Sequence, residues 1–97
     1  MLYTVNRSPL SASSLQSVLR IAPAGSPILL YEDGVYAAVP GASSAPLVRA
    51  ALANHPIYAL DADLQARGIT TVLDQIQVVG YDGFVELVEQ HQVAPWL

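Results

Sequence analysis

The segment Ile28-Leu29-Leu30-Tyr31-Glu32-Asp33-Gly34 is the clearest indication of an α/β fold in the sequence. Its first four residues are continuously apolar, which is typical of a strand buried on both faces of a parallel sheet. The next three residues form a polar stop, so we expect the strand to end sharply in a turn. For Gly34 this turn predicts a positive φ, a conformation that glycine adopts at no steric cost. Residues 35–39 remain ambiguous between a helical turn and a strand.

Short apolar runs of the same kind occur elsewhere and predict three further strands, at residues 2–5, 57–60 and 76–79. Between the strands, apolar residues recur at three- and four-residue spacing, which predicts helices. The expected helices cover residues 45–54, 62–67 and 83–91, and a first one ends near residue 22 with Ser11 or Ser13 as its N-cap. Residues 92–97 are expected to form a tail.

Helix ends carry suitable capping residues. Asp61 and Asp82 precede two of the expected helices as N-caps, and Gly68 follows one of them, where a left-handed residue is usual. Strands that alternate with helices indicate crossover connections. We therefore expect one small α/β domain over residues 1–97, with helices on both sides of a mainly parallel sheet.

The composition is rich in apolar residues and poor in charge. Apolar residues make up 53% of the chain and charged residues 12%, about half the usual share. A chain of this composition exposes an unusually apolar surface when it folds, so we expect other subunits to bury part of that surface. The net charge of −4, with four scattered arginines and no lysine, argues against direct nucleic-acid binding.

Several other classes of protein are disfavoured as well. No apolar run approaches the roughly 20 residues of a membrane span, and the N-terminus lacks the pattern of a signal peptide, so we expect a cytoplasmic location. The chain has no cysteine, which excludes thiolate metal sites and a cysteine nucleophile on this polypeptide.

Polar residues follow the expected strands, and ligands of open α/β sheets bind at the carboxyl ends of the strands. These residues are Asn6, Arg7 and Ser8, then Glu32 and Asp33, then Asp61 and Asp63. The carboxylates can be read as oxygen ligands of a metal, but a turn at Asp33-Gly34 and a helix cap at Asp61 explain them without one, and we expect no metal or cofactor. Arg7 can bind an anion or, as we favour, form an ion pair with this acidic rim.

No catalytic constellation is expected. The serines lack a nucleophile-elbow motif, and His55 and His91 fall at expected helix ends, where an imidazolium favours the helix dipole. Trp96 stands near the end of the chain, and its large ring predicts burial against its own domain or, as we favour, against a partner.

Four segments in order resemble the TusB/DsrH family of sulfur-relay subunits, within the DsrE-like group. They are Leu2-Tyr3-Thr4-Val5-Asn6-Arg7-Ser8-Pro9, Leu29-Leu30-Tyr31-Glu32-Asp33-Gly34-Val35-Tyr36-Ala37-Ala38, Tyr58-Ala59-Leu60 with Asp63-Leu64-Gln65-Ala66-Arg67-Gly68, and Tyr81-Asp82-Gly83-Phe84-Val85 with Trp96. This resemblance covers nearly the whole length, and it marks Arg7, Asp33, Gly34, Gly68 and Trp96 as candidate structural or interface residues.

The resemblance implies a DsrE-like fold and a subunit of a TusBCD- or DsrEFH-type heterohexamer, with two copies each of this chain and of TusC- and TusD-like sisters. TusBCD-type complexes pass persulfide sulfur toward 2-thiolation of the tRNA wobble uridine, and the related DsrEFH complexes of sulfur-oxidising bacteria act in dissimilatory sulfur metabolism. The resemblance leaves both roles open. Some relatives carry a cysteine in the first helix, where this chain has Val18. The resemblance therefore implies a non-catalytic subunit that acts beside a sister with the reactive cysteine. The alternative is a stand-alone α/β domain that binds a small molecule or an anion.

Overall fold

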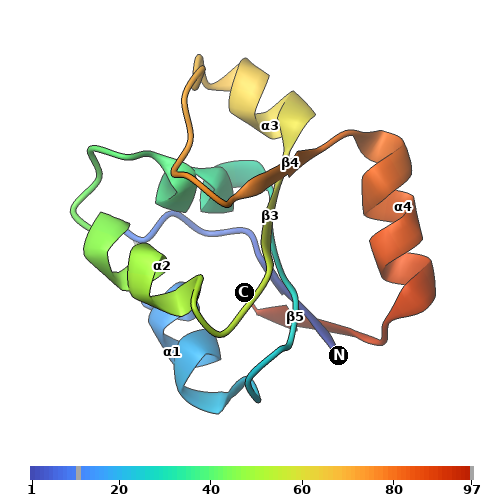
Figure 1. Cartoon of the computed structure of the whole chain (residues 1–97). Coiled ribbons are helices and arrows are strands. Elements are labelled where there is room, and N and C mark those ends of the chain that lie inside the picture. Colours follow the sequence, from blue (N-terminus) through green and yellow to red (C-terminus); the bar gives the residue numbers. More distant parts are fainter. Residues whose placement is uncertain (11, 97) are drawn as a thin grey trace.

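A computed structural model describes residues 1–10 and 12–96, and at Trp96 it describes the backbone. Figure 1 shows five strands and their connecting helices. In chain order they are β1 (Leu2–Val5), α1 (Ser14–Ile21), β2 (Ile28–Leu30), the 3₁₀-helix η1 (Glu32–Ala38), α2 (Ala45–Ala51), β3 (Ile57–Leu60), α3 (Asp61–Ala66), β4 (Gln77–Val79), α4 (Tyr81–Gln90) and β5 (Val93–Trp96).

The strands form one sheet in the order β4-β3-β2-β1-β5, and every neighbouring pair is parallel. The expected α/β class with a mainly parallel sheet is confirmed. The expected tail is wrong, because residues 93–96 pair with β1 in the register Leu2↔Val93 to Val5↔Trp96. Pro95 lies within β5, and a proline is tolerated there because β5 is an edge strand.

The ambiguous stretch at residues 35–39 belongs to η1, so the chain turns helical directly after β2. Two expected N-caps are wrong. Asp61 is the first residue of α3, where its carboxylate accepts a hydrogen bond from Nε2 of Gln65 at 2.8 Å, and α4 is capped by Gly80 rather than Asp82. Ser13 caps α1 without a side-chain hydrogen bond, and the other candidate, Ser11, lies outside the described residues.

The two faces of the sheet are covered unequally. One face packs against α1, η1, α2 and α3, and the main core lies there, with Val5, Val18 and Ile28 fully enclosed. On the other face α4 lies alone, as Figure 1 shows, and encloses a smaller cluster of Leu2, Leu29 and Leu87. The right-handed crossover rule explains this division. The chain steps from β1 to β4 in one direction and then returns past β1 to β5, which carries α4 to the opposite face.

None of the described helices is long enough and apolar enough to span a bilayer.

Candidate functional site

The polar residues predicted at the carboxyl ends of the strands belong to three elements of the structure. Asn6, Arg7 and Ser8 follow β1, Glu32 and Asp33 open η1 after β2, and Asp61 and Asp63 open α3 after β3. Because all strands are parallel, these ends meet at one edge of the sheet. At this edge, hydrogen bonds connect Asp33, Asp63, Arg67 and the backbone of Glu32. We call these four residues the Arg67 cluster.

Arg67 lies at the C-terminal end of α3 and connects this helix to η1. Its Nε and Nη2 donate to Oδ1 of Asp33 at 3.0 and 2.8 Å, and its Nη1 donates to the backbone carbonyl of Asp63 at 3.1 Å. Nη1 also lies 3.7 Å from Oδ1 of Asp63, and the guanidinium carbon lies 6.0 Å from the centre of the Tyr36 ring. The hydrogen bond to Asp33 is the main cause that raises the pKa of Arg67, against a smaller lowering by desolvation. Its positive charge is therefore permanent.

Asp63 has a second task within the Arg67 cluster. Its Oδ2 accepts a hydrogen bond of 2.7 Å from the backbone N–H of Glu32. Glu32 has φ +48°, which is uncommon for a residue that is not glycine and which follows directly on the end of β2. The carboxylate of Asp63 thus stabilises a strained backbone turn at Glu32. Asp33 and Asp63 are therefore both engaged in contacts within the chain. No group of three or more metal-ligating side chains occurs among the described residues.

Gly34 is required by close packing and not by its backbone conformation. The prediction of a positive φ is wrong, because the described glycines with positive φ are Gly25 and Gly68. A Cβ at Gly34 would instead overlap the carbonyl oxygen of Val5 and lie 3.4 Å from Cα of Asn6. Glycine therefore allows η1 to lie against the end of β1. Gly68 has φ +68° directly after α3, which confirms the expected left-handed helix end.

Arg7 does not join the acidic rim. It is exposed, and no hydrogen bond or ion pair connects its side chain to the residues that the structure describes. The ion pair that we expected for Arg7 is made by Arg67. The contact between Arg67 and Asp63 could have been predicted from the sequence, because residues four apart on a helix lie on the same side. The partner Asp33, 34 residues away, carries no such local signal.

Val18, where the resemblance placed the cysteine of some relatives, lies inside the protein. Val18 is fully buried in the main core, on the face of α1 that packs against the sheet. A thiol at this position would be enclosed among apolar side chains, and burial in apolar surroundings raises a thiol pKa and suppresses its reactivity. For Trp96 the structure gives the pairing of its backbone with β1, and its side chain lies outside the described part.

His55 and His91 are not brought together with a serine in a catalytic arrangement among the described residues. His55 is buried, and its Nδ1–H donates to the carbonyl oxygen of Ser26 at 3.0 Å. This bond ties the end of the α2 segment to the loop before β2. His91 is the C-cap residue of α4, so it lies at a helix end as expected, whereas His55 lies four residues beyond the end of α2.

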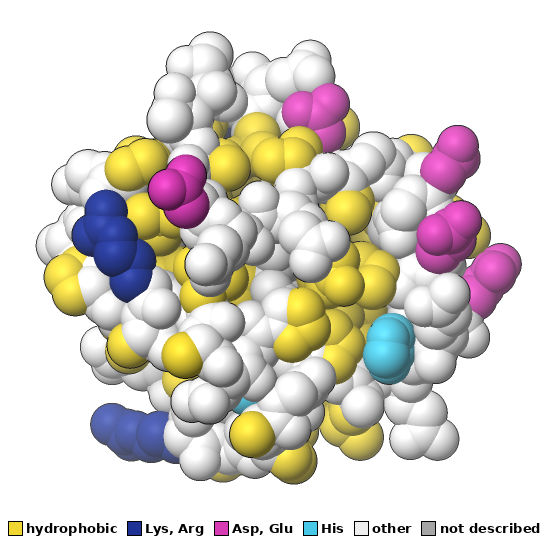
Figure 2. Space-filling model, viewed as in Figure 1, with side chains coloured by type: hydrophobic (Ala, Val, Ile, Leu, Met, Phe, Trp, Pro, Cys, Tyr) yellow, Lys and Arg dark blue, Asp and Glu magenta, His cyan; other side chains and the backbone are white. Residues whose placement is uncertain are grey.

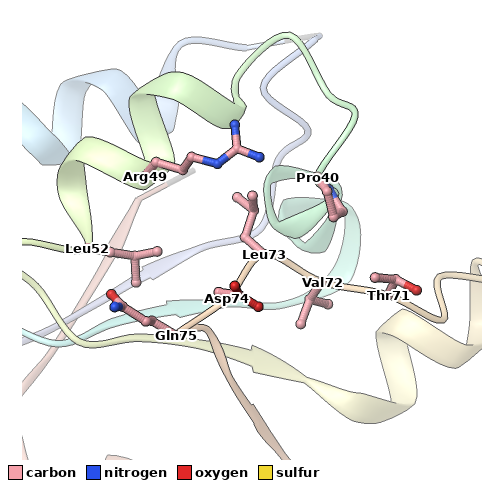
Figure 3. A pocket seen from close by; sticks show the side chains of 8 residues that line it. All are labelled: Pro40, Arg49, Leu52, Thr71, Val72, Leu73, Asp74 and Gln75. Atoms are coloured by element: carbon pink, nitrogen blue, oxygen red, sulfur yellow. The ribbon is translucent and has the colours of Figure 1, made fainter.

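A surface groove of about 450 Å³ lies between α2 and the segment before β4 (Figure 3), and no residue of the Arg67 cluster lines it. Its lining consists of Pro40, Arg49, Leu52, Thr71, Val72, Leu73, Asp74 and Gln75. Arg49 and Asp74 give it one charge of each sign, and they form no ion pair within the described chain. The mixed lining selects no class of ligand.

Comparison with known proteins agrees with this architecture. Residues 7–94 match the model of the family described as DsrH like protein. A protein named Protein TusB from Serratia proteamaculans (strain 568) is 45% identical over 95 residues, which cover 95% of each chain, and a Protein TusB from Erwinia tasmaniensis is 40% identical over 99% of this chain and all of its own. Among solved structures, the ychN protein from E. coli has a TM-score of 0.82 at 18% identity, with 98% of this chain and 97% of that chain covered.

The class defined by the fold is a small α/β protein with an all-parallel five-stranded sheet and the ychN-like topology. Within this class the family match and the full-length similarity to the TusB proteins are decisive. The chain belongs to the DsrH-like family.

Proposed function

We propose that this chain is a non-catalytic subunit of a TusBCD/DsrEFH-type sulfur-relay complex, which supports persulfide transfer for 2-thiolation of the tRNA wobble uridine. The observation that carries this proposal is the similarity to proteins named TusB, which extends over 95% or more of both chains at 40–45% identity. Residues 1–97 act as one unit in this role, in the cytoplasm and beside TusC- and TusD-like sisters with two copies of each chain.

The chemistry of the relay explains why the reactive group belongs on a sister chain. In each transfer a thiolate attacks the outer sulfur of a persulfide, a new S–S bond forms, and the donor leaves as a thiolate. The acceptor must therefore be a thiol, and none of the 97 residues is cysteine. Serine and histidine side chains do not hold sulfane sulfur in this way. A first-helix cysteine would in any case lie at the enclosed position of Val18.

The role that remains for this chain is structural support. The Arg67 cluster fixes η1 and α3 to each other, and Gly34 fixes η1 to the end of β1. Together these contacts make the carboxyl edge of the sheet rigid. A chain with net charge −4 contributes little direct attraction for tRNA phosphates, so contact with the RNA belongs to other components.

The test is deletion of the gene in its own host, followed by mass spectrometry of the nucleosides of total tRNA. We expect the 2-thiouridine content of the wobble position to fall strongly and to return when the chain is supplied from a plasmid. The variant Val18→Cys serves as a control. It should restore thiolation as well as the wild-type chain does and no better, because the proposal assigns no chemistry to this position. Unchanged thiolation in the deletion strain would contradict the proposal.

A further inference from the structure

The α4 side of the sheet is incompletely covered by the chain itself. Five strands at about 4.8 Å spacing span roughly 20 Å, whereas one helix with its side chains is about 10 Å wide. Parallel sheets normally have both faces covered. On this side, however, α4 lies alone (Figure 1), and Val93 on β5 is 40% exposed next to buried Leu2. The chain itself therefore leaves this face open at its β5 edge.

The helix α4 itself carries more apolar surface than the sheet can bury. Phe84 and Leu87 pack against the sheet, and beside them runs a row formed by Tyr81, Val85 and Val88. The spacings of four and three residues place this row along one side of the helix. Its members are 74%, 37% and 38% exposed. The apolar arc of α4 thus continues from the core to the surface of the molecule.

A second row, offset by one residue, is entirely acidic and consists of Asp82, Glu86 and Glu89. All three are exposed, and no ion pair or hydrogen bond links them to another described residue. The helix has no lysine, arginine or histidine. Asp82 lies in the first turn, where the helix dipole favours an acidic side chain, but like charges at this spacing repel along the helix. Positive charge on a partner would relieve this repulsion. We call the apolar row and the acidic row together the α4 outer face.

The arginines of this chain do not supply the positive charge that would pair with the acidic row. Arg67 is engaged with Asp33, and Arg20 and Arg49 lie on α1 and α2, across the sheet from α4. The remaining arginine, Arg7, forms no ion pair with a described residue. In Figure 2 acidic side chains gather on the side of α4, whereas the basic ones lie on the opposite side, where an acidic side chain lies beside them. An acidic surface also repels the phosphates of nucleic acids and of anionic lipids. The occupant that fits is a protein surface with an apolar strip bordered by lysine or arginine.

We infer that the α4 outer face is the docking site for a sister subunit of the relay complex, which meets the apolar row with an apolar strip and the acidic row with basic side chains. This inference rests on the proposed function. To that function it adds the surface at which the sister subunit binds and the apolar and basic side chains that the sister must present. It also predicts that assembly weakens as the ionic strength rises. Interfaces of this kind derive attraction and specificity from complementary charge, and the attraction weakens as salt screens it.

The experiment uses the full chain co-expressed with its two sister chains, and it measures assembly by analytical ultracentrifugation at low and high salt. The test variants are the double charge reversal E86K/E89K and the milder E86Q/E89Q, with Tyr81→Ser for the apolar row. We expect charge reversal to weaken assembly at least about tenfold, and neutralisation to reduce the dependence on salt. Matched controls on the other side are Asp74→Lys and Ile21→Ser, whose side chains are also exposed.

Folding is controlled by the thermal melting of each isolated variant. We expect E86Q/E89Q to melt no lower than the wild type, because it removes like-charge repulsion within α4. If the wild-type chain does not assemble with its sisters, both the proposed function and this inference fail. If the wild type assembles and the α4 variants assemble equally well at every salt concentration, the proposed function stands and the inference is wrong.

Discussion

Replacing Gly34 by alanine tests the packing of η1 against β1. The added Cβ would overlap the carbonyl oxygen of Val5 and lie 2.9 Å from its carbonyl carbon. That oxygen also accepts the N–H of Tyr31 at 3.1 Å, so the new methyl group meets a backbone that is already engaged. Val5 is fully buried in an interior strand and cannot yield. We therefore expect η1 to move away from the sheet, which loosens the buried residue Val35 that follows.

The magnitude follows from the rigidity of both partners. Overpacking of a core costs about 1–3 kcal/mol, and a clash with backbone atoms on both sides belongs at the upper end, about 3 kcal/mol. For a chain of this size 1 kcal/mol corresponds to roughly 4–8 °C, so the melting temperature should fall by at least about 12 °C. The matched control is Gly41→Ala, because a Cβ there meets no atom within 4 Å and φ is not positive.

Urea unfolding followed by circular dichroism measures both variants on the isolated chain. Gly41→Ala should be neutral or stabilise by up to about 1 kcal/mol, since alanine restricts the unfolded chain. Gly34→Ala should lower the free energy of unfolding by about 3 kcal/mol. A loss below about 1 kcal/mol, or equal effects of the two substitutions, would refute the reasoning about close approach.

Further predictions concern the contacts that hold the edges of the sheet. Arg67→Met should lower the free energy of unfolding by about 1 kcal/mol, a value reduced by the exposure of Asp33, whereas Arg49→Met should change it by less than about 0.5 kcal/mol in the same urea titration. His55→Leu should cost about 1–2 kcal/mol because the carbonyl of Ser26 loses its donor, and His91→Leu should cost less. A chain that ends at residue 94 loses half of β5, so its melting temperature should fall even without partners, and an unchanged value would mean that this pairing contributes nothing.

The sequence predicts the interior of the fold well, because buried parallel strands have a strong local signal. Residues 2–5 and 57–60 are strands with the predicted bounds. The fifth strand lacks this signal. It contains Pro95 and lies at an edge, where a strand need not be continuously apolar, and its pairing with β1 joins opposite ends of the chain. Such a contact depends on the course of the whole chain and not on any local pattern.

In the candidate site, too, a local feature, the acidic residues at the strand ends, was predicted correctly, and contacts between distant residues were not. The carboxyl ends of the strands locate the acidic residues correctly, yet the arginine that meets them is Arg67 and not Arg7. Arg7 closely follows a strand and was therefore expected beside the acidic residues. Arg67 instead lies at the end of α3 and reaches Asp33 in η1 through the packing of these two elements. Likewise, glycine at position 34 is recognisable as special in the sequence, but the reason is a neighbour 29 residues away.

The mass of each subunit after sulfur loading shows directly which chain of the complex accepts the sulfur. The complex of this chain with its two sisters is purified, incubated with a persulfide donor protein and analysed by intact-mass spectrometry under denaturing conditions without reductant. We expect a sister subunit to gain the mass of one or more sulfur atoms, while this chain, which has no cysteine, keeps its mass. A stable gain of sulfur on this chain would contradict the account.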